Sequence, residues 1–338
     1  MMKPFLPAVL VAGLALLPDA QLSWVGANDT AAELSVGGLI FKKSDSVSME
    51  SEELAITPDA VTIRYRFSNR SPNSVTLTVA FPLPDIDLSE AANFAIPVAD
   101  SMNFVGFETK VDGKPVAFKL HQRALLVDKD VSSQLKEFGI PPLPLGKLQD
   151  RIAELPYTAR TRLIDQGLLV KSGSNERGQP LYDAGWKVST SAVREQTFEP
   201  GRPVQVEHRY RTSLGMSFDT VLRKGLRQNK AMATEVLRYR KEYCVSDRFL
   251  ADLDNLAGEA EANAQKIQER RISYVLKTGA NWAGPIKQFR LVVDTGKPGQ
   301  LASFCAPNIK RISPTAFEVR AENFTPTENL KILLVGQF

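Results

Sequence analysis

The chain has 338 residues, and its 42 lysines and arginines exceed its 38 aspartates and glutamates by only four charges. With 43% hydrophobic and 24% charged residues it has the composition of a globular protein, which excludes an extended disordered chain. The small positive excess is not typical of nucleic-acid-binding proteins. A chain of this length predicts about two domains, each with its own core.

The N-terminus has the order of features found in secretory signal peptides. Lys3 precedes an apolar run at residues 5–17, and the small residues of Val25-Gly26-Ala27 follow. The run is 13 residues long (5 to 17), shorter than the ~20 residues that a membrane-spanning helix needs. We expect cleavage after Ala27 and release of the mature chain into the periplasm, with no transmembrane anchor and no nucleic-acid partner. A retained membrane anchor is the alternative.

The first half of the chain, residues 28–220, has the pattern of a β-sandwich domain. Residues 61–67 and 75–81 alternate between apolar and polar side chains, as half-buried strands do. The polar residues between these two runs predict a turn, so we expect an antiparallel hairpin. Further strands are expected at residues 33–41, 46–56, 104–111, 116–127 and 204–210. Because no regular alternation of strand and helix occurs, the pattern predicts an antiparallel sandwich rather than a doubly wound sheet.

A helical insertion at residues 128 to about 180 interrupts these strands. Helices are expected at residues 133–138, 147–155 and 158–166. Gly139 suits the end of the first helix, and Pro156 separates the other two. Residues 172–175 contain Gly and Ser and predict a flexible loop at the end of the insertion.

The second half, residues 221–338, is predicted to be a helix followed by a smaller β unit. Ser246 is a suitable helix N-cap, and apolar residues recur after it at helical spacing as far as Ile267. Strands are expected at residues 272–277, 289–294, 301–305, 317–321 and 330–335. The predicted fold is therefore mainly β, in the α+β class, with a second sandwich-like unit after the helix.

Cys244 and Cys305 are the two cysteines of the chain. In an oxidising periplasm, such a pair favours a disulfide. Two separately buried thiols remain the alternative, because spacing in the sequence does not show that two residues are close in space.

Several segments together resemble a known family. The most specific are FPLPD at residues 81–85 and TGANWAGPI at residues 278–286. The others are residues 32–41, 61–80, 207–215, 243–244, 274–277, 289–294, 303–305 and 317–319. Over nearly the whole mature chain, they are similar to the bacterial exported family catalogued as domain of unknown function 4424. The resemblance implies export, two β-rich parts and pairing of the two cysteines, and it implies no reaction and no catalytic residue.

One pattern is typical of an enzyme. Ser133 and Lys136 have the spacing S-x-x-K, and residues 277–279 read K-T-G, as in penicillin-interacting serine enzymes. The third element of those enzymes, S-x-N or S-D-N, is absent between Lys136 and residue 277. The sequence therefore assigns no catalytic residue. An envelope enzyme acting on peptidoglycan or a related acyl substrate is kept as an alternative function.

No metal or cofactor site is predicted. Asp-x-Asp pairs occur at residues 85–87 and 128–130, but a Ca²⁺ site needs six to eight oxygen ligands and no full ligand loop follows. Aspartates in such loops commonly support turns instead. We expect the two histidines to lie apart, with His208 facing a core and His121 facing water.

Two segments are candidates for binding. The loop at residues 279–285 combines glycines with Asn281, Trp282 and Pro285, and aromatic side chains anchor many interfaces. The alternative is that Trp282 fills the end of the second sandwich. The basic residues of 223–241 could approach anionic lipid head groups or an acidic partner. A solvated charged helix face is the alternative there.

These observations favour a non-enzymatic binding or assembly module of the cell envelope. Its partner is expected to be a periplasmic or envelope protein or a small ligand. An outer-membrane β-barrel is a further alternative, because Leu330, Ile332, Leu334 and Phe338 share parity as in the last strand of such barrels. The predicted helices interrupt the long series of strands that a barrel needs.

Overall fold

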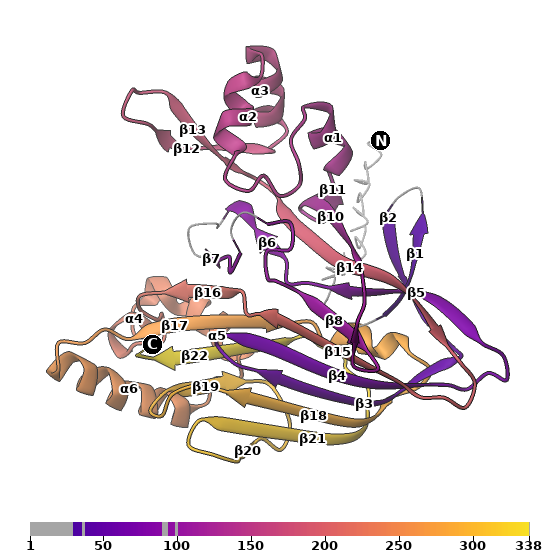
Figure 1. Cartoon of the computed structure of the whole chain (residues 1–338). Helices are drawn as coiled ribbons and strands as arrows, with labels where there is room; N and C mark the ends of the chain where they lie inside the picture. Colours follow the sequence, from indigo (N-terminus) through magenta and orange to yellow (C-terminus); the bar gives the residue numbers. More distant parts are fainter. Residues whose placement is uncertain (1–29, 36–37, 90–93, 99–100, 338) are drawn as a thin grey trace, which may run out of the picture.

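Three large sheets and a projecting helical insertion make up the fold (Figure 1). The computed structural model describes residues 30–35, 38–89, 94–98 and 101–337. The predicted signal peptide, residues 1–27, lies outside these described residues. Within them, no helix is long and apolar enough to cross a membrane. Strands far outnumber helices, so the predicted mainly β, α+β class is confirmed.

The largest sheet has eight strands in the order β20-β21-β18-β3-β4-β15-β8-β9. Their bounds are β3 Val47–Ile56, β4 Ala60–Asn69, β8 Glu108–Val111, β9 Lys114–Pro115, β15 Val204–Arg211, β18 Ile286–Asp294, β20 Lys310–Arg311 and β21 Ala316–Phe324. Every second residue of β4 is apolar and faces the core, since successive side chains of a strand point to opposite faces. These residues, Val61, Ile63, Tyr65 and Phe67, are all buried. One face of this sheet therefore lies on the core.

A parallel pairing joins the two halves of the chain within this sheet. β18 pairs with β3 in parallel, with Leu291 opposite Leu54, whereas the other pairings are antiparallel. Strands from both sides of the predicted boundary at residue 220 thus share one sheet.

A five-stranded sheet packs on one part of the inner face. Its order is β19-β22-β17-β16-β7, with bounds β7 Phe94–Ala95, β16 Leu214–Ser217, β17 Gln268–Tyr274, β19 Leu301–Phe304 and β22 Leu330–Gly336. The hydroxyl oxygens of Tyr65 on β4 and Tyr274 on β17 lie 3.3 Å apart across the interface between the two sheets.

Helices cover the outer face of the five-stranded sheet. They are α4 Lys224–Arg227, the 3-10 helix η2 Lys230–Met232, α5 Ala233–Glu242 and α6 Asp247–Ala262. Ser246 caps α6 as predicted, because its side chain accepts a hydrogen bond from the backbone N–H of Phe249. Leu333 and Val335 of β22 contact the helices, and Ile332 and Leu334 contact the inner core, so this strand is buried on both faces.

A seven-stranded sheet covers the rest of the inner face. Its order is β11-β10-β14-β5-β1-β2, with β6 also paired to β14. The bounds are β1 Thr30–Ser35, β2 Gly38–Lys42, β5 Val75–Pro82, β6 Ile86–Asp87, β10 Lys119–Leu126, β11 Lys129–Asp130 and β14 Lys187–Phe198. Phe81 of β5 stacks on Phe107 and lies 4.7 Å from the ring of His208 on β15.

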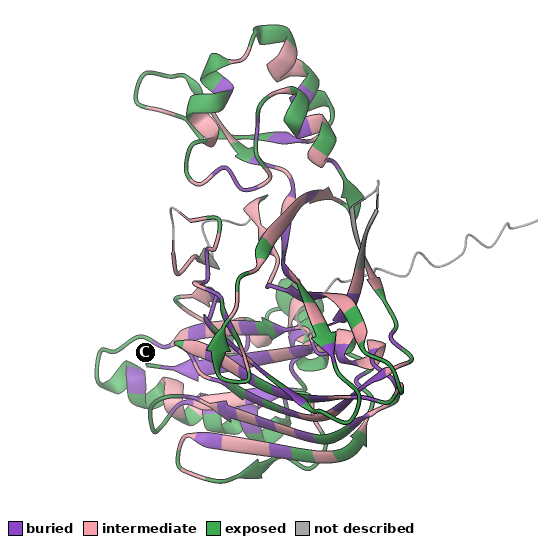
Figure 2. Cartoon of the chain, turned by 45° about the vertical axis from the view of Figure 1, so that its right-hand side comes forward, coloured by how far each residue is buried: buried purple, intermediate pink, exposed green. Residues whose placement is uncertain are grey.

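The insertion stands away from the three sheets, between β11 and β14 (Figure 1). It contains α1 Ser132–Glu137, α2 Leu148–Glu154, α3 Tyr157–Asp165 and the hairpin of β12 Leu169–Ser174 and β13 Pro180–Ala184. Figure 2 shows that most of its surface is exposed or intermediate, with few buried positions. At its base, the indole N–H of Trp186 donates a 2.8 Å hydrogen bond to the carbonyl of Pro142.

Three expectations about the strands were wrong. The single strand expected at residues 33–41 is divided between β1 and β2, which pair antiparallel. β4 and β5 do not pair as a hairpin, since β4 pairs with β3 and β15 while β5 pairs with β1 and β14. The Asn69 side chain supports the connection between them, because it donates to the carbonyls of Asn73 and Phe198 and accepts from the Ser71 N–H. The connection therefore carries the chain from one sheet to the other across the core. Residues 172–175, expected as a flexible loop, belong to the end of β12 and its turn.

Candidate functional site

The insertion presents large apolar side chains to solvent on α3 and β12. Tyr157 is 77% exposed, Val170 is 51% exposed and Ile164 is 39% exposed. An open hollow of about 450 Å³ lies along α3, beside Tyr157. It is lined by Tyr157, Thr158, Thr161, Arg162, Asp165 and Gln166. We call the three apolar side chains together with this hollow the α3 surface.

The α3 surface rests on a well-packed support. Leu163 is fully buried beneath the helix. Gly167, with a φ of +71°, ends α3 by turning the chain, and the N–H of Leu168 then bonds the carbonyl of Leu163 at 2.9 Å. Arg162 lies 5.6 Å from the ring of Phe138 and so ties α3 to the end of α1. The exposed side chains therefore project from a supported helix rather than from a free loop.

A buried polar cluster fastens α5 to the five-stranded sheet. The hydroxyl of Tyr239 donates a 2.7 Å hydrogen bond to the carboxylate of Glu269, which is only 1% exposed. Arg271 donates to Tyr239 at 2.7 Å and to Glu269 at 2.9 Å, and it also reaches Ser217. Burial, with the nearby Glu269 carboxylate, raises the pKa of Tyr239 well above its usual range. We call Tyr239, Glu269 and Arg271 the α5 clamp.

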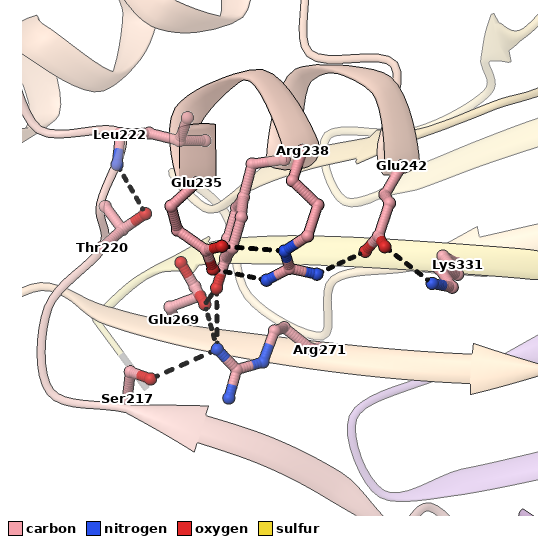
Figure 3. A network of polar contacts seen from close by, with 10 residues as sticks. Ser217, Thr220, Leu222, Glu235, Arg238, Glu242, Glu269, Arg271 and Lys331 are labelled. Carbon is pink, nitrogen blue, oxygen red and sulfur yellow. Dashed lines mark hydrogen bonds and ion pairs between the residues drawn. The ribbon is translucent and has the colours of Figure 1, made fainter. Parts of the chain in front are cut away.

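A second set of ion pairs runs along the same helix (Figure 3). Arg238 bonds both Glu235 and Glu242, and Lys331 of β22 lies 3.1 Å from Glu242. The hydrogen bond that Glu235 accepts from Arg238 holds the pKa of Glu235 below its usual range. Figure 3 shows the side chains of Glu235, Arg238 and Glu242 directed toward the strands that carry Arg271 and Lys331. One side of α5 is thereby committed to the sheet.

The predicted disulfide is present and closes the end of α5. Cys244 follows the helix directly and is bonded to Cys305, which follows β19, with the two Cα atoms 5.1 Å apart. Beside it, Ser303 donates a 2.8 Å hydrogen bond to the carbonyl of Tyr243. The clamp and the disulfide both hold the C-terminal half of α5 in place.

The loop at residues 279–285 is placed mainly inside the protein. Trp282 is fully buried, with its ring centroid 4.6 Å from that of Phe67 and 6.1 Å from that of Phe198. Asn281 is half-buried and donates to the hydroxyl of Thr30 at 3.0 Å. Pro285 is also half-buried. The ring of Trp282 fills the end of the core against the two phenylalanines.

The serine and lysine patterns do not meet. Ser133 and Lys136 lie on α1, which packs on β10. Residues 277–279 form part of the 3-10 helix η3, Lys277–Asn281, which contacts β1. β14 and β5 lie between β10 and β1 in the sheet. The K-T-G residues are also on a helical turn rather than on a strand, so the two halves of the enzyme pattern do not build one site.

One aspartate of each pair supports a local turn. Asp87 accepts from the N–H and hydroxyl of Ser89, and Asp130 accepts from the N–H of Ser132. Asp85 lies at the base of the insertion. Burial raises its pKa to about 6, against the opposing effects of a hydrogen bond from Ser189 and of nearby cationic side chains. Within the described parts of the chain, no cluster of three or more potential ligands suits a metal ion.

The sequence reasoning missed the α3 surface and the α5 clamp. Tyr157 directly follows Pro156, where a helix start was expected, yet nothing in the local pattern marked its ring as exposed. The clamp joins residues 30 positions apart on a helix and a strand. The one signal in the sequence is Glu269, an acidic residue between the apolar Ile267 and Ile272. An acidic residue in such a segment can also be exposed, so it does not by itself predict a buried carboxylate.

Solved structures with some likeness to this chain are distant. One is a crystal structure from Legionella pneumophila subsp. pneumophila str. Philadelphia 1 of a protein provisionally described as nutrient binding. It is 14% identical, with a TM-score of 0.45, over 91% of this chain and 70% of that chain. Two crystal structures of a two-domain M1 zinc metallopeptidase variant, bound to L-arginine and to L-tryptophan, are 8% identical with a TM-score of 0.26. Their matches cover 87% of this chain and 43% and 44% of those chains.

None of these likenesses carries a function to this chain. No curated protein matches it. The family model described as Domain of unknown function (DUF4424) matches residues 27–333, which is nearly the whole chain. The chain therefore belongs to the DUF4424 family, as the resemblance of its segments indicated.

Proposed function

We propose that this protein is a non-enzymatic binding module of the bacterial cell envelope, and that it recognises a partner protein through the α3 surface. The observation that carries the proposal is the 77% exposure of Tyr157 on a helix that is otherwise held by a buried leucine and a cation–π contact. Tyrosine is enriched at protein interfaces, because its ring is apolar and its hydroxyl can still reach a polar group.

The chemistry around Tyr157 fits an interface. Val170 and Ile164 add apolar area on the same subdomain, while Arg162 and Asp165 border the hollow with one charge of each sign. An apolar centre with a polar rim is the usual composition of protein recognition sites. The hollow is open, whereas small-molecule sites enclose most of their ligand. A protruding side chain of another protein suits it better than a free small molecule.

The periplasm is the proposed location. The support is the order of Lys3, the apolar run at residues 5–17 and the small residues at 25–27, together with the disulfide, which persists in an oxidising compartment.

The test compares complexes in native extracts of the source cells. A tagged chain is followed by native gel in three forms: wild type, Tyr157→Ser with Val170→Ser, and the control Ile309→Ser with Ile312→Ser. The control changes two isoleucines that are 40% and 49% exposed elsewhere on the protein. All four positions are on the surface, so we expect the free energy of unfolding of each variant to differ from that of wild type by less than about 1 kcal/mol.

The proposal predicts that wild type and control migrate in a complex heavier than the purified chain. The variant of the α3 surface should migrate at the size of the purified chain. If all three forms migrate at the size of the purified chain, or if the α3 variant keeps the heavier complex, the proposal is wrong.

A further inference from the structure

A second exposed apolar surface extends from the bend at Phe218 over α4, η2 and α5, where η2 contacts both neighbouring helices. Figure 1 shows these helices beside the five-stranded sheet, away from the insertion. The exposed apolar side chains are Phe218 at 77%, Leu237 at 67%, Leu226 at 39% and Met232 at 37%. We call residues 218–241 the α4–α5 ledge.

The packing of α5 turns Leu237 outward. Tyr239 and Tyr243 are buried against α6 and β22, and they define the inner side of the helix. Leu237 is two positions before Tyr239, which is roughly 200° around an α-helix, so it lies on the opposite side. Lys241 follows Leu237 by four positions and shares its outer stripe. At the other end of the ledge, the 3.1 Å ion pair of Arg223 with Asp219 holds the residue next to Phe218 against the start of α4.

The ledge carries a concentrated positive charge. Seven lysines and arginines stand against Asp219 and Glu235 within residues 218–241. The four arginines are neutralised by acidic partners: Arg223 by Asp219, Arg227 by Asp254, Arg238 by Glu235 and Glu242, and Arg240 by Asp247. The three lysines, Lys224, Lys230 and Lys241, are exposed and form no ion pair within the described parts of the chain.

We propose that the α4–α5 ledge docks the protein on a bilayer that contains anionic phospholipid. Lysines with flexible stems can reach phosphate groups while nearby leucine, methionine and phenylalanine side chains enter the boundary with the acyl chains. Each lysine near such a surface adds attraction that is screened by salt. Three of them with four exposed apolar side chains provide the two signals, electrostatic and apolar, that interfacial binding combines.

A charged helix that only faces water needs no large apolar side chains on the same side. A site for an acidic protein would use the lysines, but it would gain little from Phe218, in the bend before α4, and Leu237 on α5, which are 77% and 67% exposed. The bilayer is the anionic surface that uses both sets of side chains. This inference rests on the ledge and is independent of the α3 surface.

The test is flotation of the purified protein with vesicles of phosphatidylcholine, with and without about 30% phosphatidylglycerol. The first variant is Lys224→Glu, Lys230→Glu and Lys241→Glu. Its control, Lys110→Glu, Lys114→Glu and Lys297→Glu, makes the same change of net charge at three exposed lysines elsewhere. A second variant, Phe218→Ser with Leu237→Ser, removes apolar side chains and leaves every charge in place.

The proposal predicts at least about tenfold tighter binding to the anionic vesicles than to neutral ones. The ledge lysine variant should bind the anionic vesicles at least about tenfold more weakly than wild type does. The control variant should bind them less than about threefold more weakly. The serine variant should lose binding at 0.5 M salt, where attraction by charge alone is screened. Equal losses in the two lysine variants, no preference for anionic vesicles, or equally tight binding to soluble polyglutamate would each overturn the proposal.

Discussion

The hydroxyl of Tyr239 on α5 lies 2.7 Å from a carboxylate oxygen of Glu269 on β17, and both residues are almost completely buried. This contact helps to fasten the helical layer to the five-stranded sheet, together with the Lys331–Glu242 ion pair and the disulfide. Arg271 reaches both atoms, so the carboxylate keeps one cationic partner if the hydroxyl is removed.

Tyr239→Phe is expected to lower the free energy of unfolding by about 1 to 3 kcal/mol, because it removes a hydrogen bond to a buried charge. Urea unfolding followed by circular dichroism measures the difference. Tyr157→Phe is the control, since the hydroxyl of that exposed residue makes no comparable buried bond. Equal stability of Tyr239→Phe and wild type would show that the clamp does not hold α5.

Cys244→Ser with Cys305→Ser is expected to lower the free energy of unfolding by about 2 to 4 kcal/mol, because the bond closes a long loop in the unfolded chain. The two cysteines are 61 positions apart. A reductant should shift the urea midpoint of wild type toward that of the double variant and leave the double variant unchanged. If the reductant leaves wild type unshifted while free thiols are detected, the prediction fails.

Asp85→Asn should change how stability depends on pH. The pKa of Asp85 is raised by burial from 3.8 to about 6, so the folded protein binds this proton more tightly than the unfolded chain does. The charged form therefore costs stability, and the cost grows as the pH rises from about 4 through 6. At pH 7 the asparagine variant should be more stable than wild type by about 1 to 3 kcal/mol. Below pH 4 the two proteins should be equally stable. Urea unfolding at several pH values checks this, and a difference that does not vary with pH contradicts it.

Gly185→Ala should destabilise the base of the insertion. A Cβ atom at this position would lie 2.1 Å from the carbonyl oxygen of Gly167, where two backbone segments pass each other. Since backbone must move, the expected cost is about 1 to 3 kcal/mol. Gly173→Ala is the control, because nothing lies within 4 Å of its Cβ position. Hydrogen exchange should rise in α3 and β12 of the first variant only, and unchanged exchange there would refute the prediction.

Local patterns in the sequence predicted local structure well. The burial of Val61, Ile63, Tyr65 and Phe67 follows from their alternation, and the N-cap of α6 follows from Ser246. The three helices of the insertion also lie within a residue or two of the expected ranges. In each case, the signal lies within a short segment of the chain.

Long-range pairing could not be predicted in the same way. β4 and β5 have the alternation of a hairpin, yet they belong to different sheets, because β4 pairs with β15 and β5 pairs with β14, strands that follow them by more than 100 positions. The sequence does not predict the strand at residues 187–198. Most of β14 is buried, and the polar Ser189, Thr190 and Ser191 stand where a clear alternation of apolar and polar residues would be expected. The sequence makes Trp282 a binding candidate, and its burial could not be predicted because it depends on two phenylalanines from distant strands.

The most direct test of the binding function is photo-crosslinking in living source cells from position 157, with a photoreactive residue in place of Tyr157. The same residue in place of Ile312, which is 49% exposed on another part of the protein, is the matched control. We predict one reproducible protein adduct from position 157, absent from position 312 and lost when Val170→Ser is added. Adducts that are the same from both positions, or no adduct from position 157 in a folded and exported chain, would contradict a partner at the α3 surface.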